Sequence, residues 1–289
     1  MISYNKETGN YEKGSCIQGF WQSLLPALLF VVLYTVFQYG GLLGYRHLAA
    51  SWPDPVRSFV RERPGLCMAA IIVLSMTAAL LTVFPEGNRR LRAFREKWDF
   101  MTAGREGMKR IPVWICLAVC AGALCILGNA QIQAAGMNSD SVYVMQPLYR
   151  EIPFPFILII FAVYTPFAEE FVFRGILYTG LRNRFSPTLS ILLAAGLFGL
   201  YHAELIQGTY AFLMGLFFCL SMEVTGDIKA PWLLHGISNG LPLVLSYFGF
   251  WESFLQRSWR AGTLICFLAS AGLLSTFLFR KKGSGRPDA

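Results

Sequence analysis

The stretch TPFAEEFVFRGILYTGL, residues 165–181, places two adjacent glutamates and an arginine inside an apolar run. The run continues toward its N-terminal side and covers about 153–181, enough for a helix to cross a bilayer, which takes roughly 20 residues. A charged side chain at the bilayer centre costs about 2.5–3.5 kcal/mol on insertion scales. Charged residues that are kept there despite this cost are expected either to form an ion pair or to have a function.

The whole chain has the composition of a membrane protein. Of its 289 residues, 55% are hydrophobic and only 15% are charged, and the mean hydropathy is +0.47. The apolar runs are continuous rather than alternating, which argues against transmembrane β-strands. We therefore expect an all-α, multi-pass transmembrane helix bundle of about eight spans, at roughly 18–44, 65–84, 111–129, 153–181, 187–205, 208–225, 230–249 and 261–280.

No segment outside these spans is long enough to form a second domain. We expect an N-terminal tail at 1–17, one transmembrane domain over 18–280 and a basic C-terminal tail at 281–289. The first apolar run is long and has no small-residue cleavage site, which predicts a retained span rather than a cleaved signal peptide. The seven cysteines lie mostly in apolar runs without CxxC spacing, which favours small buried side chains.

The net charge of +8 is distributed unevenly among the connections. With eight spans, most Lys and Arg residues of the connections fall on the side that holds both termini and the basic loop at 85–110. The positive-inside rule places this side in the cytoplasm, so we expect a plasma-membrane protein with cytoplasmic N- and C-termini. No nucleic-acid-binding motif accompanies the basic loop, and we expect the lipid bilayer, not nucleic acid, as its partner.

The acidic span combines an ion pair with a second carboxylate. Glu170 and Arg174 are four residues apart with the acid first, the order that favours a helical ion pair. Glu169 is rotated about 100° from Glu170 and presents a different face. Thr165–Pro166 predicts a break in the span, with Thr165 capping a new helix that begins at Pro166. The two glutamates would then lie near a helix N-terminus, where the helix dipole favours negative charge, whereas burial opposes ionisation.

Two other spans carry polar residues at helical spacing. His202 follows Phe198 by four residues and Asn239 follows His235 by four, so each pair lies on one helix face. At about 1.5 Å of rise per residue, Glu169 and His202 both lie roughly 20 Å from the cytoplasmic ends of their spans. We expect the three polar rows to converge on one cavity inside the membrane.

These three rows resemble the motifs of a known family. The sequence EEFVFR at 169–174 fits EExxxR, FGLYH at 198–202 fits FxxxH, and HGISN at 235–239 fits HxxxN. In order and spacing they are similar to the CAAX protease and bacteriocin-processing family, called CPBP or Abi, which contains the type II prenyl-protein endopeptidases. The resemblance covers about residues 150–250.

The resemblance implies an intramembrane endopeptidase of the glutamate-dependent type. Its substrate would be a membrane-associated peptide or protein. Carried over motif by motif, Glu169 and His202 would activate the attacking water, and Glu170 and Arg174 would complete the first motif. Hydrolysis of a peptide bond needs such a base for water.

His235 and Asn239 would hold the oxyanion, for which hydrolysis needs positioned donors, and Phe198 would shape the wall of the substrate-binding cavity. We expect no cofactor, since the chain lacks an HExxH motif. A metal-dependent variant stays open, in which Glu169, His202 and His235 would bind a divalent metal such as zinc, with water as the fourth ligand.

Two other classes of protein fit part of the pattern. Intramembrane charges and a proline-interrupted span are also typical of transporters and channels, but the two halves of this chain show no internal repeat. A non-catalytic scaffold, for example one that confers bacteriocin immunity, would keep the helices without the reaction. The ordered motifs favour the protease, and the sequence indicates neither the oligomeric state nor whether the substrate is prenylated.

Overall fold

The computed structural model describes residues 3–4, 11–12, 14–48, 51–102, 111–134, 148, 150–250, 253 and 257–279. These residues are mainly helical, and a short antiparallel pair, β1 (Ser3–Tyr4) and β2 (Tyr11–Glu12), precedes the first long helix. The chain divides into two compact units, Met1–Arg92 with Ser139–Ala194, and Ala93–Asn138 with Ala195–Ala289.

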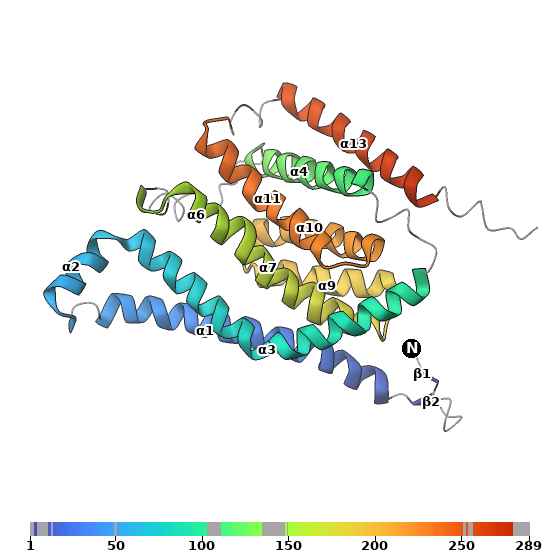
Figure 1. The fold of residues 1–289 in the computed structure, drawn as a ribbon, viewed down its shortest axis with the longest axis horizontal. Coiled ribbons are helices and arrows are strands. Elements are labelled where there is room, and N and C mark those ends of the chain that lie inside the picture. Colours follow the sequence, from blue (N-terminus) through green and yellow to red (C-terminus); the bar gives the residue numbers. More distant parts are fainter. Residues whose placement is uncertain are drawn as a thin grey trace, which may run out of the picture. The chain divides into compact units, whose positions relative to one another are not determined.

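The expected all-α membrane protein is confirmed (Figure 1). The expected division into two tails and one transmembrane domain stays a prediction, and its tail at 281–289 lies outside the described residues.

Each of the eight expected spans coincides with helical structure. Within the described residues, five helical segments are long and apolar enough to cross a membrane: Gln18–Tyr45, Pro64–Glu96, Pro112–Ile132, Phe154–Arg182 and Leu205–Thr225. Pro187–Tyr201 and Arg260–Leu273 are apolar but shorter. Helix α11 (Lys229–Tyr247) has 19 residues but is less apolar, because His235 and Asn239 of the third motif lie in it.

In the first unit, one long helical run carries the acidic motif. It comprises α6 (Phe154–Leu158), η3 (Ile159–Tyr164), α7 (Thr165–Glu170), η4 (Phe171–Tyr178) and α8 (Thr179–Arg182), where η3 and η4 are π-helical. We call residues 154–182 the acidic helix. Helix α1 (Gly14–Leu48) packs against η4 and α8. It is followed by the short α2 (Asp54–Glu62) and the long α3 (Pro64–Thr102), which are drawn in blue and cyan (Figure 1).

The break expected at Thr165–Pro166 is wrong, because the acidic helix continues through both residues. Thr165 has helical dihedral angles and makes no side-chain capping hydrogen bond. Proline lacks an N–H and its ring clashes with the carbonyl four residues earlier. The π-helical turn before Pro166 relieves this conflict, because Thr165 N–H donates to the Ile160 carbonyl five residues back. Glu169 and Glu170 therefore lie in the middle of a helix, beyond the reach of an N-terminal dipole.

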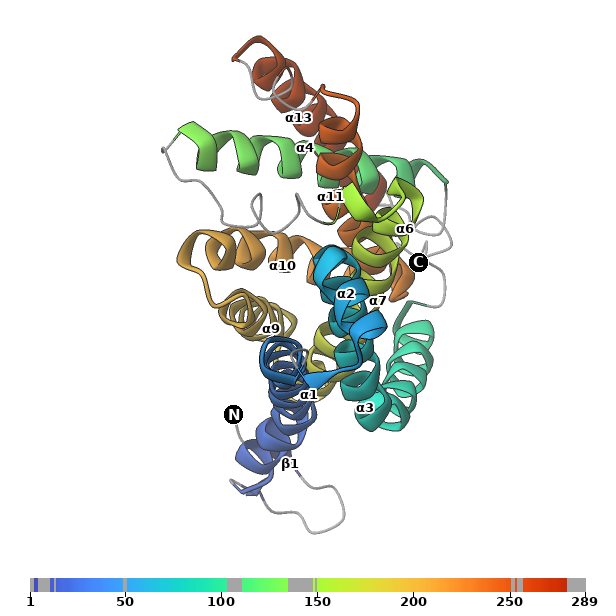
Figure 2. The same cartoon turned by 90° about the vertical axis from the view of Figure 1, so that its left-hand side faces the viewer.

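In the second unit, α4 (Ile111–Ala134) is the central helix. It packs against α10 (Leu205–Thr225), α11 and α13 (Arg257–Phe279). Helix α13, in red, runs beside α4, in green, in both views (Figures 1 and 2). A polar contact joins α4 to α11, since Cys125 Sγ donates to the Ser238 carbonyl at 3.2 Å. The left-handed Gly226 ends α10 at φ 69° and turns the chain toward α11.

Helix α9 (Pro187–Tyr201) ends four residues earlier than the expected 187–205 span. A tight turn at 202–204 follows, in which Ala203 has φ 57°, a left-handed conformation that is uncommon for a residue with a Cβ. The turn brings the end of α9 against the start of α10. A Cβ added to Gly199 would lie 2.7 Å from the Gly208 carbonyl oxygen, so these backbones meet at a distance that only glycine permits.

Exchanging Gly199 for alanine is expected to destabilise the protein, because the new methyl group overlaps the Gly208 carbonyl. Gly196→Ala is the matched control. It lies one turn earlier in the same helix, has no atom within 4 Å of the added Cβ, and gains helix propensity of up to about 1 kcal/mol. Thermal unfolding in detergent, followed by tryptophan fluorescence, should give a lower midpoint for Gly199→Ala only. Equal midpoints for the two variants would contradict the close helix approach.

Candidate active site

The first motif forms a buried ionic group in the middle of the acidic helix. Glu170 and Arg174 have no exposed side-chain surface, and Arg174 Nη1 donates to Glu170 Oε1 at 2.8 Å. The ion pair expected from the spacing is therefore present. Glu169 is also buried, with 6% of its surface exposed. The motif thus combines a neutralised pair with an adjacent carboxylate on another helix face.

Two π-helical segments flank the six residues of α7 that contain both glutamates. A π-helical turn is wider than an α-helical turn and leaves backbone carbonyls in need of other donors, and such turns are frequent at functional sites. The hydroxyl of Thr179, the first residue of α8, donates to the Gly175 carbonyl of η4 at 2.6 Å. The sequence did not predict these segments, since no residue preference identifies a π-helical turn.

Side chains from α1 and α3 surround the acidic helix within the first unit. Phe171, next to Glu170, stacks on Phe84 of α3 with ring centroids 5.1 Å apart. Tyr34 of α1 lies close enough to Glu169 for an electrostatic interaction. Sequence reasoning missed Tyr34, because it lies in a span without a recognisable motif and its register toward Glu169 depends on tertiary packing.

The second motif positions an imidazole through its own helix. His202 follows the last residue of α9, and its Nδ1 lies 2.9 Å from the carbonyl oxygen of Phe198. A carbonyl only accepts hydrogen bonds, so Nδ1 is the donor in this contact. Nε2 of the neutral ring is then the nitrogen with a free lone pair. The rings of Phe198 and Tyr201 hold His202 edge to face, at centroid distances of 4.9 and 5.3 Å.

Phe198 connects the second motif with the third. Its ring contacts His202, and it also meets the His235 ring edge to face at 5.7 Å. His235 is buried and stacks on Phe218 of α10 with centroids 4.9 Å apart. The structure therefore brings Phe198, His202 and His235 together in the second unit, with the phenylalanine as their shared wall. Asn239 lies one turn further along α11 and is half-buried.

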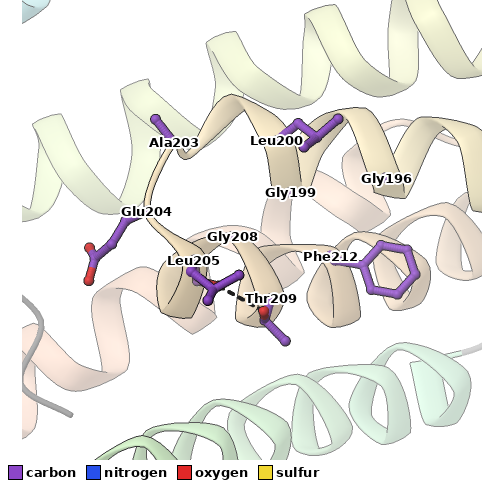
Figure 3. A pocket seen from close by; sticks show the side chains of 9 residues that line it. All are labelled: Gly196, Gly199, Leu200, Ala203, Glu204, Leu205, Gly208, Thr209 and Phe212. Atoms are coloured by element: carbon purple, nitrogen blue, oxygen red, sulfur yellow. Dashed lines mark hydrogen bonds between the residues drawn. The ribbon is translucent and has the colours of Figure 1, made fainter.

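A pocket of about 450 Å³ lies at the turn between α9 and α10 in the second unit (Figure 3). It is lined by the end of α9, the turn and the start of α10, with Leu200 and Phe212 among its apolar residues. Glu204 lies at the turn and points away from both helices. Ala203, which lines the pocket, directly follows His202 in the chain.

Among the described residues, no three His, Cys, Asp or Glu side chains form a group that could hold a metal ion. Within its two units, the structure groups the glutamates with Arg174 and the histidines with Phe198. The catalytic roles given to these residues stay predictions, as does the choice between water alone and a metal-bound water.

Exchanging Arg174 for methionine is expected to destabilise the protein by about 3–5 kcal/mol, because it leaves Glu170 without its buried cation. The double variant Glu170→Gln, Arg174→Met removes both charges and should regain much of this loss. Thermal unfolding of both variants in detergent measures the difference. If the double variant is less stable than Arg174→Met alone, the loss of stability in Arg174→Met does not come from the Glu170 charge that has lost its cation.

Comparison with family models matches residues 151–241 to the type II CAAX prenyl endopeptidase Rce1-like family. No curated protein and no solved structure matches the chain significantly. The matched segment contains all three motifs and lies inside the region of about 150–250 that they predict. It supports a membrane-embedded hydrolase of the CAAX protease type. Residues 151–241 are thus similar to type II CAAX prenyl endopeptidases, which supports a CAAX protease family for this segment of the chain.

Proposed function

We propose that this protein is an intramembrane endopeptidase that hydrolyses a peptide bond of a membrane-associated peptide or protein with a glutamate- and histidine-activated water. The observation that carries this proposal is the buried Glu169, which lies beside a neutralised ion pair in a segment of the CAAX protease type.

Glu169 and His202 act as the bases in the proposed reaction. A water molecule adds through its oxygen to the carbonyl carbon of the peptide bond and gives up a proton to the carboxylate or to Nε2 of His202. The contact between Nδ1 and the Phe198 carbonyl supports this role for His202, because it leaves Nε2 as the acceptor. The C–N bond then breaks, and the leaving amine takes the proton.

His235 and Asn239 provide donors for the oxyanion of the tetrahedral intermediate. Stacking on Phe218 and the edge of Phe198 restrict the rotation of the His235 ring, so its N–H direction is set before the reaction. Preorganised donors in a site shielded from water are worth more than donors that must reorient. Phe198 would form the wall of the substrate cavity.

We further propose that the protein lies in the plasma membrane with both termini in the cytoplasm, as the distribution of Lys and Arg predicts. Its partners are the bilayer and a membrane-associated peptide or protein. The name of the matched family suggests a prenylated substrate as the first to test.

Glu169→Gln is expected to lower the rate of peptide cleavage by at least about 100-fold, because general base catalysis contributes roughly that factor or more. His202→Ala should have a similar effect, and the double variant should lose no more than the worse single variant. Glu223→Gln, which removes a half-buried carboxylate from a different span, is the control and should keep wild-type activity. The measurement is cleavage of prenylated and unprenylated membrane peptides by purified protein, with and without chelator.

Cleavage that survives Glu169→Gln would contradict the catalytic assignment. Loss of wild-type cleavage with chelator and recovery with zinc would replace the activated water by a metal-bound water. Cleavage of the unprenylated peptide at an equal rate would remove the prenyl group as a recognition element.

Cysteine labelling tests the orientation. Arg57 in α2 and Arg95 in α3 are both exposed, with 48% and 60% of their side-chain surfaces accessible. The charge distribution predicts that a membrane-impermeant maleimide labels Arg57→Cys in intact cells and Arg95→Cys only after permeabilisation, relative to the native cysteines of the wild type. The reverse labelling pattern would overturn the orientation.

A further inference from the structure

One face of α3 packs against the acidic helix within the first unit. Phe84, Gly87 and Arg90 are spaced three residues apart, which keeps them on neighbouring turns of α3. Phe84 stacks on Phe171, and a Cβ on Gly87 would overlap the same ring. The absence of a side chain at position 87 therefore lets Phe171, the residue after Glu170, reach α3.

Arg90 adds a polar anchor to this apolar contact. Its Nη1 donates to the Ile176 carbonyl at 3.1 Å, and its Nη2 donates to the Gln22 carbonyl of α1 at 2.8 Å. Its Nε pairs with Glu86 on its own helix. Only 14% of the Arg90 side chain is exposed, and its contact with the Ile176 carbonyl is partly buried. One guanidinium group thereby joins α3, α1 and η4.

Gly180 makes room for this guanidinium. A Cβ at position 180 would overlap Arg90 Nη1 and the Ser23 side chain. The glycine follows the π-helical segment, and its missing side chain admits a cation to the Ile176 carbonyl. The neighbouring Gly175 carbonyl is bound by Thr179, so side chains hold two successive carbonyls of this widened helix.

The anchored backbone lies close to the proposed reactive groups. Ile176 is two residues beyond Arg174, which forms the ion pair with Glu170, and Glu169 precedes Glu170 directly. An arginine on a backbone carbonyl fixes the helix itself, independent of the rotamer of any side chain. Arg90 lies outside the family-matched residues 151–241, so the family match does not assign it.

We propose that Arg90 is a positioning residue, which holds the π-helical part of the acidic helix so that Glu169 keeps its catalytic place. This inference rests on the proposed endopeptidase function. It gives α3 and Gly180 a defined part in the reaction. Arg90 touches no reacting atom, and it acts through the Ile176 carbonyl and the Glu170–Arg174 pair.

The test compares Arg90→Gln with Arg89→Gln. The two arginines are adjacent and both pair with Glu86, but Arg89 is 74% exposed, and only Arg90 donates to the Ile176 and Gln22 carbonyls. We expect Arg90→Gln to lower kcat for peptide cleavage about 10- to 100-fold, since small misplacements of a catalytic group cost rates of this order. KM should stay within about twofold, and Arg89→Gln should match the wild type. Arg90→Lys should rescue only part of kcat, because an ammonium group lacks the planar fork of arginine.

A second measurement follows the anchor without the reaction. Hydrogen exchange in detergent should show faster exchange of the amides of 174–182 in Arg90→Gln and in Gly180→Ala than in Arg89→Gln, at temperatures where all variants are folded. Because both substitutions break one contact, their effects on kcat should not add in the double variant.

Equal kcat and equal exchange for Arg90→Gln and Arg89→Gln would overturn the proposal. A raised KM at unchanged kcat would overturn it too, because it would assign Arg90 to binding. If the wild type cleaves no peptide, the proposed function fails, whereas the exchange measurement still decides whether Arg90 holds the helix.

Discussion

The buried ion pair between Glu170 and Arg174 is the constraint on which the first unit depends. Its two charges are completely shielded and only 2.8 Å apart. In an apolar medium each charge alone would be strongly unfavourable, so the helix is tolerated in the membrane only while both are present. The pair also explains how Glu169 can be kept. Because Arg174 pairs with Glu170, the proposed reaction is assigned to the adjacent Glu169.

The pair in turn requires a helix that places Glu170 and Arg174 on the same face, and neighbouring side chains that hold this helix in place. Residues four apart face each other only in a helical segment, and the pair spans the boundary between α7 and η4. A π-helical turn at this boundary shifts the faces of the helix and loosens its own hydrogen bonds. The packing of Phe171 against α3, the Thr179 hydroxyl of the same helix and the Arg90 guanidinium of α3 compensate for this loosening. The reactive segment is thus held mainly by residues that do not react.

Much of this molecule could be predicted from sequence because its signals are local. Apolar runs long enough to cross the bilayer predict the helices. The i, i+4 spacing of Glu170 and Arg174 predicts their ion pair. The prediction failed at Thr165–Pro166. Proline favours a helix start, but here a π-helical turn accommodates the proline and the helix continues without a break. It also placed the end of this span at 205, although α9 ends at Tyr201 and the backbone turns at Ala203.

The contacts that no local signal encodes are those between distant segments. Gly180 and Arg90 are 90 positions apart, and a sequence pattern gives no reason to connect a glycine in one helix with an arginine in another. The structure connects them, because a Cβ at position 180 would overlap the guanidinium of Arg90. The same logic applies at His202. Its motif names the residue, but only the contact of Nδ1 with the Phe198 carbonyl selects Nε2 as the nitrogen that can take a proton. The motifs therefore supply the reactive groups, while the tertiary packing decides which atom of each group is able to act.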